Sequence, residues 1–211
     1  MTEYCGPAPH TNMDAHSSRD TRAVILEGKW LNLRLAQPSD AGYIHQLRMD
    51  PTYNLHLSAV NGTVQDQEDW LHRYKTREAA GVEYYYVIER RSDARPCGLV
   101  RLYDIEKSQF TWGSWILDQN KTPKAALESA LLIYVKGFEE LGLSKSVFDV
   151  RLDNARTLAF HRRFGAVETG RDAQDVFFEY TAAQFRADKD RHLAAIRASQ
   201  SPEGRRSIES S

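Results

Sequence analysis

The stretch from Phe110 to Ala166 constrains the fold more than any other part of the chain, because its periodicity changes from strand to helix and back. Residues 110–117 (FTWGSWIL) are aromatic and β-branched, which predicts a buried strand. After a polar run, apolar side chains recur at spacings of three and four, which places them on one face of a long helix. These apolar positions are Leu127, Ala130, Leu131, Tyr134, Phe138 and Leu141.

Punctuating residues mark the ends of that helix. Thr122 is placed to cap its N-terminus, Pro123 suits its first turn, and Gly142 stands where a helix commonly stops. Residues 146–150 then predict a second buried strand, and residues 154–164 a short helix. A strand that leads into a helix N-terminus is a natural anion site, so a phosphate-bearing cofactor is the first expectation.

The rest of the chain predicts a mixed α/β (α+β) domain between two tails. Residues 1–22 form an expected flexible tail, residues 23–198 a single domain, and residues 199–211 an expected disordered tail. The remaining strands are expected at 24–35, 83–89, 96–105, 167–171 and 176–180, and the remaining helices at 39–49, 65–80 and from Thr181 onward. Residues 53–62 are expected to form a loop.

Tryptophans are expected at two kinds of position. Trp112 and Trp115 are expected on opposite faces of their strand, because they are three residues apart. Trp70 is expected to form the buried stripe of the 65–80 helix together with Leu71 and Tyr74.

Two segments carry a resemblance to a known family. Residues 154–166 (NARTLAFHRRFGA) resemble the pattern Asn-x-x-Ala-x-x-Leu-Tyr-x-x-x-Gly-Phe of the GNAT superfamily of acetyl-CoA-dependent N-acetyltransferases. Residues 120–125 (NKTPKA) resemble its pyrophosphate motif Gln/Arg-x-x-Gly-x-Gly/Ala, with Pro123 in place of the first Gly. Pro123 has no N–H, so one phosphate donor is absent. The resemblance covers roughly residues 24–185.

This resemblance implies a GNAT-like twisted mixed β-sheet flanked by helices, with two splayed central strands that hold CoA between them. It implies acetyl-CoA as the co-substrate and no metal. The backbone of Trp115, Ile116 and Leu117 would hold the pantetheine, and the loop before the long helix would bind the pyrophosphate. The implied cofactor-binding residues are Trp115, Ile116, Leu117, Lys121, Thr122, Lys124, Ala125, Ala126 and Asn154.

The resemblance also implies a catalytic residue. His161 falls on the Tyr that typically protonates the departing CoA thiolate in this family. An ordinary imidazole pKa of about 6.5 and a thiol pKa of about 8.5 make that transfer favourable. The alternative is a surface histidine on a short helix. No general base stands out, since Asp104, Glu106 and Asp149 near the strand ends also fit structural or solvated roles.

The acceptor is expected to be a primary amine on a small molecule. Asn54, His56 and Ser58 lie in the segment that shapes the acceptor pocket in this family, and Trp112 is a further substrate candidate. The resemblance favours a nucleotide-linked amino sugar for surface glycans. Protein N-termini and other small amines are alternatives, and so is a non-catalytic acetyl-CoA-binding or interaction protein. A sugar-nucleotide acceptor predicts a cleft for a uracil or thymine ring beside an aromatic side chain, whereas a peptide predicts an open groove.

Composition excludes other classes. Lys plus Arg (28) nearly balance Asp plus Glu (29), which disfavours a nucleic-acid partner. No apolar run approaches the ~20 residues that would cross a membrane, and the N-terminus lacks a signal-peptide core, so a cytoplasmic protein is expected. Cys5 and Cys97 are expected to be free thiols. A homodimer is compatible with the sequence, which leaves the oligomeric state open.

Overall fold

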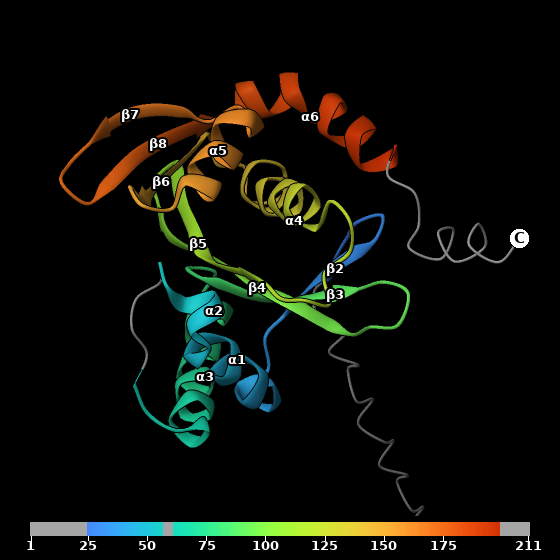
Figure 1. The fold of residues 1–211 in the computed structure, drawn as a ribbon, viewed down its shortest axis with the longest axis vertical. Helices are drawn as coiled ribbons and strands as arrows, with labels where there is room; N and C mark the ends of the chain where they lie inside the picture. Colours follow the sequence, from blue (N-terminus) through green and yellow to red (C-terminus); the bar gives the residue numbers. More distant parts are fainter. Residues whose placement is uncertain (1–24, 57–60, 199–211) are drawn as a thin grey trace, which may run out of the picture.

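A computed structural model describes residues 25–56 and 61–198, and within these ranges a single eight-stranded sheet organises the chain (Figure 1). The two predicted tails and the proposed contact at Ser58 lie outside the described residues. The strand order is β1-β2-β3-β4-β5-β6-β8-β7, and every neighbouring pair is antiparallel except β5 with β6. The strands are β1 (Ile25–Glu27), β2 (Leu31–Leu35), β3 (Tyr84–Arg90), β4 (Pro96–Glu106), β5 (Gln109–Leu117), β6 (Lys145–Arg151), β7 (Val167–Arg171) and β8 (Asp175–Thr181). The predicted mixed sheet flanked by helices is confirmed.

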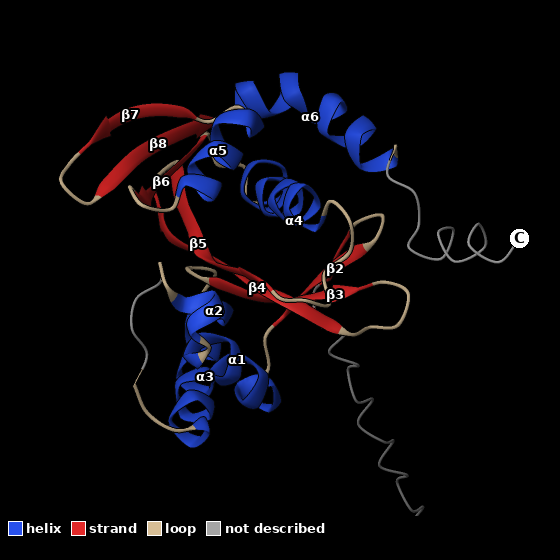
Figure 2. Ribbon diagram, in the orientation of Figure 1, coloured by secondary structure: helices blue, strands red, loops and turns tan. Residues whose placement is uncertain are grey.

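Helices cover both faces of this sheet (Figure 2). On one face lie η1 (Pro38–Asp40), α1 (Ala41–Met49), α2 (Pro51–Asn54) and α3 (Val64–Ala79), and on the other lie α4 (Ala125–Tyr134), α5 (Ala155–Phe164) and α6 (Ala182–Arg197). A hydrophobic core lies on each face of the sheet, and side chains that alternate along β3 contribute to both. Tyr86 and Ile88 pack on the α4 side, and Tyr85 and Val87 pack on the α1 and α3 side. No helix in the described part of the chain is both long and apolar enough to span a membrane.

The structure departs from the predicted elements in four places. The helix begins at Ala125, because Lys124 adopts a left-handed conformation (φ 64°) and Pro123 therefore lies outside it. Thr122 does not cap the helix through its hydroxyl; its carbonyl accepts a hydrogen bond from the Ala125 N–H at 3.2 Å instead. After Tyr134 the helix widens into a π-helical turn, Val135–Glu140. The short helix α2 also occupies the start of the predicted 53–62 loop.

A glycine in this π-helical turn makes room for an aromatic ring of the core. A Cβ on Gly137 would lie 2.2 Å from Cζ of Phe110, whose ring is fully buried. Phe110 itself stands edge-on to Tyr134 and Phe138, at centroid distances of 6.4 and 5.2 Å. The β5 strand and the α4 segment can therefore approach this closely only because the helix presents no side chain at this position.

Substitution of this glycine tests the contact. Gly137→Ala should lower the free energy of unfolding by about 1–3 kcal/mol, because the added methyl overpacks a rigid core. Gly42→Ala is the matched control: on α1, no atom of another element lies within 4 Å of the position that its added methyl would take. That control should be neutral or stabilising by up to about 1 kcal/mol. Urea unfolding of both variants checks this, and a Gly137→Ala protein as stable as the wild type would contradict the packing argument.

Candidate functional site

The site begins where the two central strands separate. β5 and β6 pair at Gln109 with Lys145 and at Phe110 with Ser146, and no further pair joins them in the described structure. On its other edge β5 continues to pair with β4 as far as Leu117, opposite Gly98. The β6-facing backbone groups of β5 therefore lack strand partners beyond Phe110. This confirms the predicted splay of the central strands.

A bulge at Ser114 sets the side chains of β5. Leu99 pairs with Ile116 and Arg101 with Gly113, so β5 carries one extra residue here, and Ser114 has a φ of 47°. The bulge reverses the alternation, and the prediction that Trp112 and Trp115 lie on opposite faces was wrong. Their ring centroids are 5.4 Å apart, and both belong to or pack against the same core.

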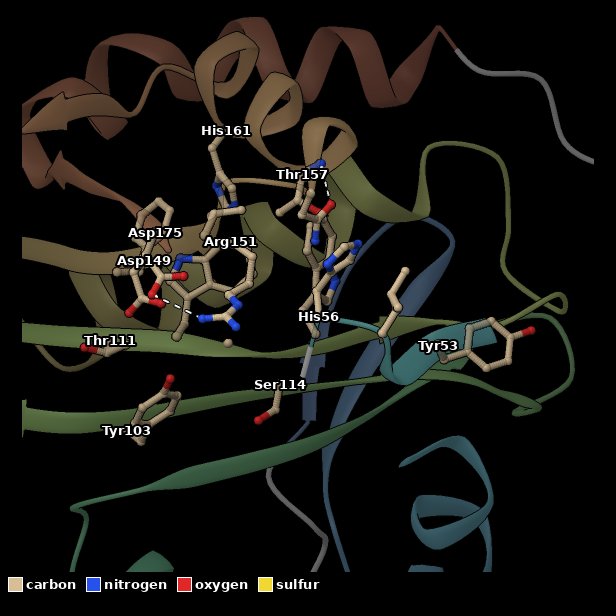
Figure 3. Close-up of a pocket in the computed structure, with 17 residues that line it drawn as sticks. Tyr53, His56, Tyr103, Thr111, Ser114, Asp149, Arg151, Thr157, His161 and Asp175 are labelled. Carbon is tan, nitrogen blue, oxygen red and sulfur yellow. Dashed lines mark hydrogen bonds and ion pairs between the residues drawn. The ribbon is translucent and has the colours of Figure 1, made fainter. Parts of the chain in front are cut away.

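A cavity of about 470 Å³ occupies the gap between the separated strands (Figure 3). His161 enters it from α5 on one face of the sheet, whereas Tyr103 and Ser114 line it from the strands β4 and β5 themselves (Figure 3). Tyr53 and His56 from the α2 region line it as well. The cavity therefore opens toward both helical layers, so two substrates could approach one point from opposite faces of the sheet.

His161 is enclosed by aromatic rings. Its own ring lies 4.5 Å from Phe148, 5.4 Å from Trp112 and 5.3 Å from Phe160 between centroids, and only 4% of the residue is exposed. The alternative of a surface histidine was therefore wrong. Within the described residues no group hydrogen-bonds to its Nδ1. Burial lowers the pKa of His161 to about 3, so the imidazole is neutral near pH 7.

The neutral state changes what His161 can do. The predicted acid role assumed that His161 is an imidazolium with an ordinary pKa. The buried ring is not protonated to imidazolium at neutral pH, so it cannot give up a second proton to the thiolate. A neutral imidazole still carries one N–H and can donate a hydrogen bond to a developing anion. The catalytic role of His161 stays a prediction, in this altered form.

Charged side chains gather at the opposite wall of the cavity. Asp149 and Arg151 project from β6, and Asp175 begins β8; Arg151 Nη1 lies 3.6 Å from Asp175 Oδ2 (Figure 3). Partial burial, together with the nearby Asp175 carboxylate, raises the pKa of Asp149. A carboxylate with a raised pKa at a cavity wall is the type of group that accepts a proton from a bound amine.

Asn154 stands at the mouth of α5. Its Oδ1 accepts a hydrogen bond from the Thr157 N–H at 3.1 Å and so caps the helix, as Asn commonly does. Asn154 and Thr157 both line the cavity. The cap occupies the carbonyl oxygen of Asn154 and leaves its amide NH₂ available to a ligand.

The loop before α4 is organised by a buried carboxylate. Asp118 accepts hydrogen bonds from the Asn120 N–H at 2.6 Å and from the Tyr43 hydroxyl at 2.9 Å. The Lys121 ammonium donates to the Asp118 carbonyl at 3.2 Å. Beyond this loop, Lys124 and Ala126 line a separate cavity of about 330 Å³ formed by α4, α5 and α6.

The structure does not gather all predicted residues at one point. Trp112, Trp115, His56, Asn154 and His161 line the strand-gap cavity. Ile116, Ala125 and Leu117 do not line it: Ile116 and Ala125 are buried in the two cores, and Leu117 ends β5. Asn54 does not line it either, because its amide donates to the Arg48 carbonyl at 3.1 Å. Lys121 and Thr122 lie in the α4 loop.

Sequence reasoning missed Tyr103, Arg151 and Asp175, which line the same cavity. Tyr103 lies beside Gly113, where a Cβ would be 3.1 Å from its hydroxyl, but this contact arises from the β4–β5 pairing and has no sign in the sequence. Arg151 and Asp175 meet only through the pairing of β6 with β8, which brings them opposite one another. Their positions in sequence carry no sign of that contact.

Comparison with known proteins adds a family. Residues 31–167 match the family described as Acetyltransferase (GNAT) domain. The structure is similar to one titled "Apo FdhC- a nucleotide-linked sugar GNAT", with 37% sequence identity and a TM-score of 0.75, over 81% of this chain and 97% of that chain. A search of curated proteins found no match.

More distant structures share the fold alone. A ribosomal-protein-S5-alanine acetyltransferase from Vibrio fischeri has 14% identity and a TM-score of 0.65, over 75% of this chain and 97% of that chain. A spermidine N-acetyltransferase from Vibrio cholerae, in complex with CoA and spermine, has 19% identity and a TM-score of 0.64, over 75% of this chain and 99% of that chain.

The neutral, buried state of His161 predicts a specific pH dependence of stability. The pKa in the folded state lies below the ordinary value, so the folded form binds fewer protons and loses stability as the pH falls from about 6.5 toward 3. Between pH 6.5 and 4.5 this loss should be about 2 kcal/mol and should disappear in His161→Gln. His72→Gln, at an exposed position of α3, should retain it. Urea unfolding at both pH values measures the difference, and an equal loss in His161→Gln and wild type would refute it.

Proposed function

Because the chain belongs to the GNAT acetyltransferase family and is an acyltransferase, we propose that it moves an acetyl group from acetyl-CoA to the amine of a nucleotide-linked amino sugar. The observation that carries the acceptor assignment is the 37% identity to the nucleotide-linked sugar GNAT, which extends over 97% of that chain. The protein-acetylating and spermidine-acetylating neighbours are 14% and 19% identical and support the fold alone.

The residues of the cavity fit acetyl-CoA as the co-substrate. The β6-facing backbone edge of β5 is left without strand partners beyond Phe110, which suits an extended amide-bearing chain such as pantetheine. The buried Thr122 hydroxyl has no hydrogen-bond partner among the described residues. Lys124, Arg163 and Arg191 make the cavity at the α4 N-terminus cationic, as phosphate binding requires.

The backbone around the Ser114 bulge would hold the thioester. The proposed cofactor contacts are the backbone of Trp115 to Leu117, the amide of Asn154, and the loop residues Lys121 to Ala126. The Ala125 N–H is already engaged by Thr122, so the Lys124 and Ala126 positions carry more of the phosphate contact. Acetyl-CoA supplies an activated acetyl thioester, and the chain's own groups supply its orientation and the proton transfers.

The two walls of the cavity take different parts in the proposed reaction. Asp149, with its raised pKa, accepts the proton of the acceptor ammonium, directly or through one water. His161 donates its imidazole N–H as a hydrogen bond toward the sulfur as the tetrahedral intermediate expels it as a thiolate. The second proton of the acetylated nitrogen passes to that thiolate, directly or through water, so that CoA leaves as the thiol. Tyr103, whose pKa is raised by burial and by Asp149, is a neutral phenol on the acceptor side. His56, paired with Asp153 at 3.2 Å, and Trp112 would border the acceptor.

A screen of acceptors tests the function. The purified protein with acetyl-CoA should release CoA when given a nucleotide-linked amino sugar and should be at least tenfold less efficient, by kcat/KM, with spermidine or with a peptide that begins with alanine. Thiol release is measured with a chromogenic disulfide, and product mass confirms the transfer. A preference for the polyamine or the peptide would overturn the proposed acceptor.

Variants of the two cavity walls should separate the two roles. Asp149→Asn should lower kcat/KM at least tenfold near neutral pH and remove the acidic limb of the pH–rate profile, because protonation of this carboxylate produces that limb. His161→Gln should lower kcat at least tenfold while the acidic limb stays in place, because the imidazole does not titrate in that range.

Asp190→Asn, on the exposed side of α6, is the matched carboxylate control and should change neither quantity more than twofold. A loss of less than twofold in His161→Gln would remove the proposed role of the imidazole, and an unchanged acidic limb in Asp149→Asn would remove that of the carboxylate.

A further inference from the structure

A second cavity lies on the α1 and α3 face of the sheet. It encloses about 350 Å³ between α1, the start of α3, β3 and β4, which is within the range of small-molecule sites. The residues that line it are His45, Arg48, Asn61, Thr63, Asp66, Gln67, Trp70, Arg73, Tyr85 and Arg101. The acyl-transfer chemistry described above uses none of them.

The charge of this cavity is positive. Arg48, Arg73 and Arg101 line it against one carboxylate, Asp66, whose oxygen already accepts hydrogen bonds from the N–H and hydroxyl of Thr63. Arg101 also pairs with the buried Glu83. That carboxylate is shared with Arg77 at 2.7 Å, which does not line the cavity, so Glu83 compensates the charge of Arg101 only in part. A planar guanidinium cluster of this kind is typical of phosphate recognition.

An aromatic side chain forms part of the wall. Trp70 packs with Leu71 and Tyr74 against the α1–α3 core, as expected, but it is only partly buried, whereas those two residues are fully buried. Its indole stacks on Tyr74 at 5.6 Å, and the guanidiniums of Arg77 and Arg101 lie 5.2 and 5.5 Å from its ring centroid. A heterocycle in the cavity would therefore meet the accessible part of the indole next to guanidiniums that can bind phosphates.

The second cavity adjoins the strand-gap cavity. Arg101 lines the second cavity and Tyr103 lines the strand-gap cavity. The Arg101 guanidinium lies 4.9 Å from the Tyr103 ring centroid. The two residues are separated by two positions on β4, roughly 7 Å along a strand. The acceptor side of the strand-gap cavity, with Tyr103 and His56, is on this same face of the sheet.

We infer that the α1–α3 cavity is the nucleotide subsite of the acceptor. Arg48, Arg73 and Arg101 bind the diphosphate, the pyrimidine nucleoside lies against Trp70, and the amino sugar extends past Tyr103 toward Asp149. This inference rests on the proposed function. It adds specificity residues that take no part in the chemical step, on elements that are separate from the CoA-binding loop.

The charge of the cavity separates this occupant from the alternatives. A polyamine such as spermidine is cationic and would be repelled by the excess of arginines over carboxylates at this cavity, whereas a nucleoside diphosphate is strongly anionic. The aromatic wall expected for a uracil or thymine ring is present in Trp70.

Calorimetric titration of the full chain with UDP and with dTDP tests the subsite. The titrations are run with saturating CoA, so that a nucleotide cannot enter the CoA site. The wild type should bind at least one of the two, and Arg73→Gln should raise the Kd tenfold or more, because one charge-assisted contact is lost. Arg73→Lys should lose less, since the positive charge remains.

Arg186→Gln is the matched control, since Arg186 is an exposed arginine of α6 that lines none of the three cavities. It should keep the Kd within twofold of the wild type. Inorganic pyrophosphate should compete with UDP in the wild type and compete less in Arg73→Gln. No binding of either nucleotide, or equal behaviour of Arg73→Gln and Arg186→Gln, would overturn the assignment.

The acceptor screen keeps this inference separate from the proposed function. If nucleotide-linked amino sugars are acetylated and Arg73→Gln leaves their KM unchanged, the subsite is wrong and the function stands. If no such sugar is acetylated but the nucleotides bind in an Arg73-dependent manner, the function is wrong and the cavity is still a nucleotide site.

Discussion

The separation of β5 from β6 is the constraint on which the rest of the structure depends. After two paired positions the strands diverge, and the bulge at Ser114 turns both tryptophans of β5 to one side. Gly137 lets Phe110 seat against the α4 segment at the last point where the strands still pair. A cavity through a sheet is costly, because its backbone groups lose their partners. A ligand that restores those hydrogen bonds offsets this cost, and the cavity is where the family chemistry is proposed to occur.

The two faces of the sheet carry different chemistry. Toward α4, α5 and α6 the cavity walls are aromatic, and burial holds His161 neutral. Toward α1 and α3 the walls carry arginines, carboxylates and tyrosines. Under the proposed function, an acyl donor and an anionic acceptor would approach from opposite layers without competing for the same surface. The proposed reacting groups would then meet where the strands are apart, between Asp149 and His161.

For several residues the structure confirmed the predicted position in the chain but changed the role that the side chain can play. His161 lies in the cavity, as the resemblance implied, but its aromatic surroundings remove the proton that its predicted role required. Trp70 lies on the predicted helix and packs against the core, but it also borders a cavity. Asn54, proposed to contact substrate, instead ties α2 to α1 through the Arg48 carbonyl. In each case the partner responsible lies on another element.

The sequence by itself determined the order of the strands and of the longer helices from residue 25 to 197, apart from the short helix α2, because hydrophobic periodicity is a local signal. It also placed Asn154 and His161 at one site, through a motif within a single short helix. Only the tertiary structure decided that Trp112 and Trp115 share a face, that Arg151 meets Asp175, and that Arg48, Arg73 and Arg101 converge. These contacts depend on a bulge, on strand register and on helix packing, which are set by interactions between residues that are far apart in the chain.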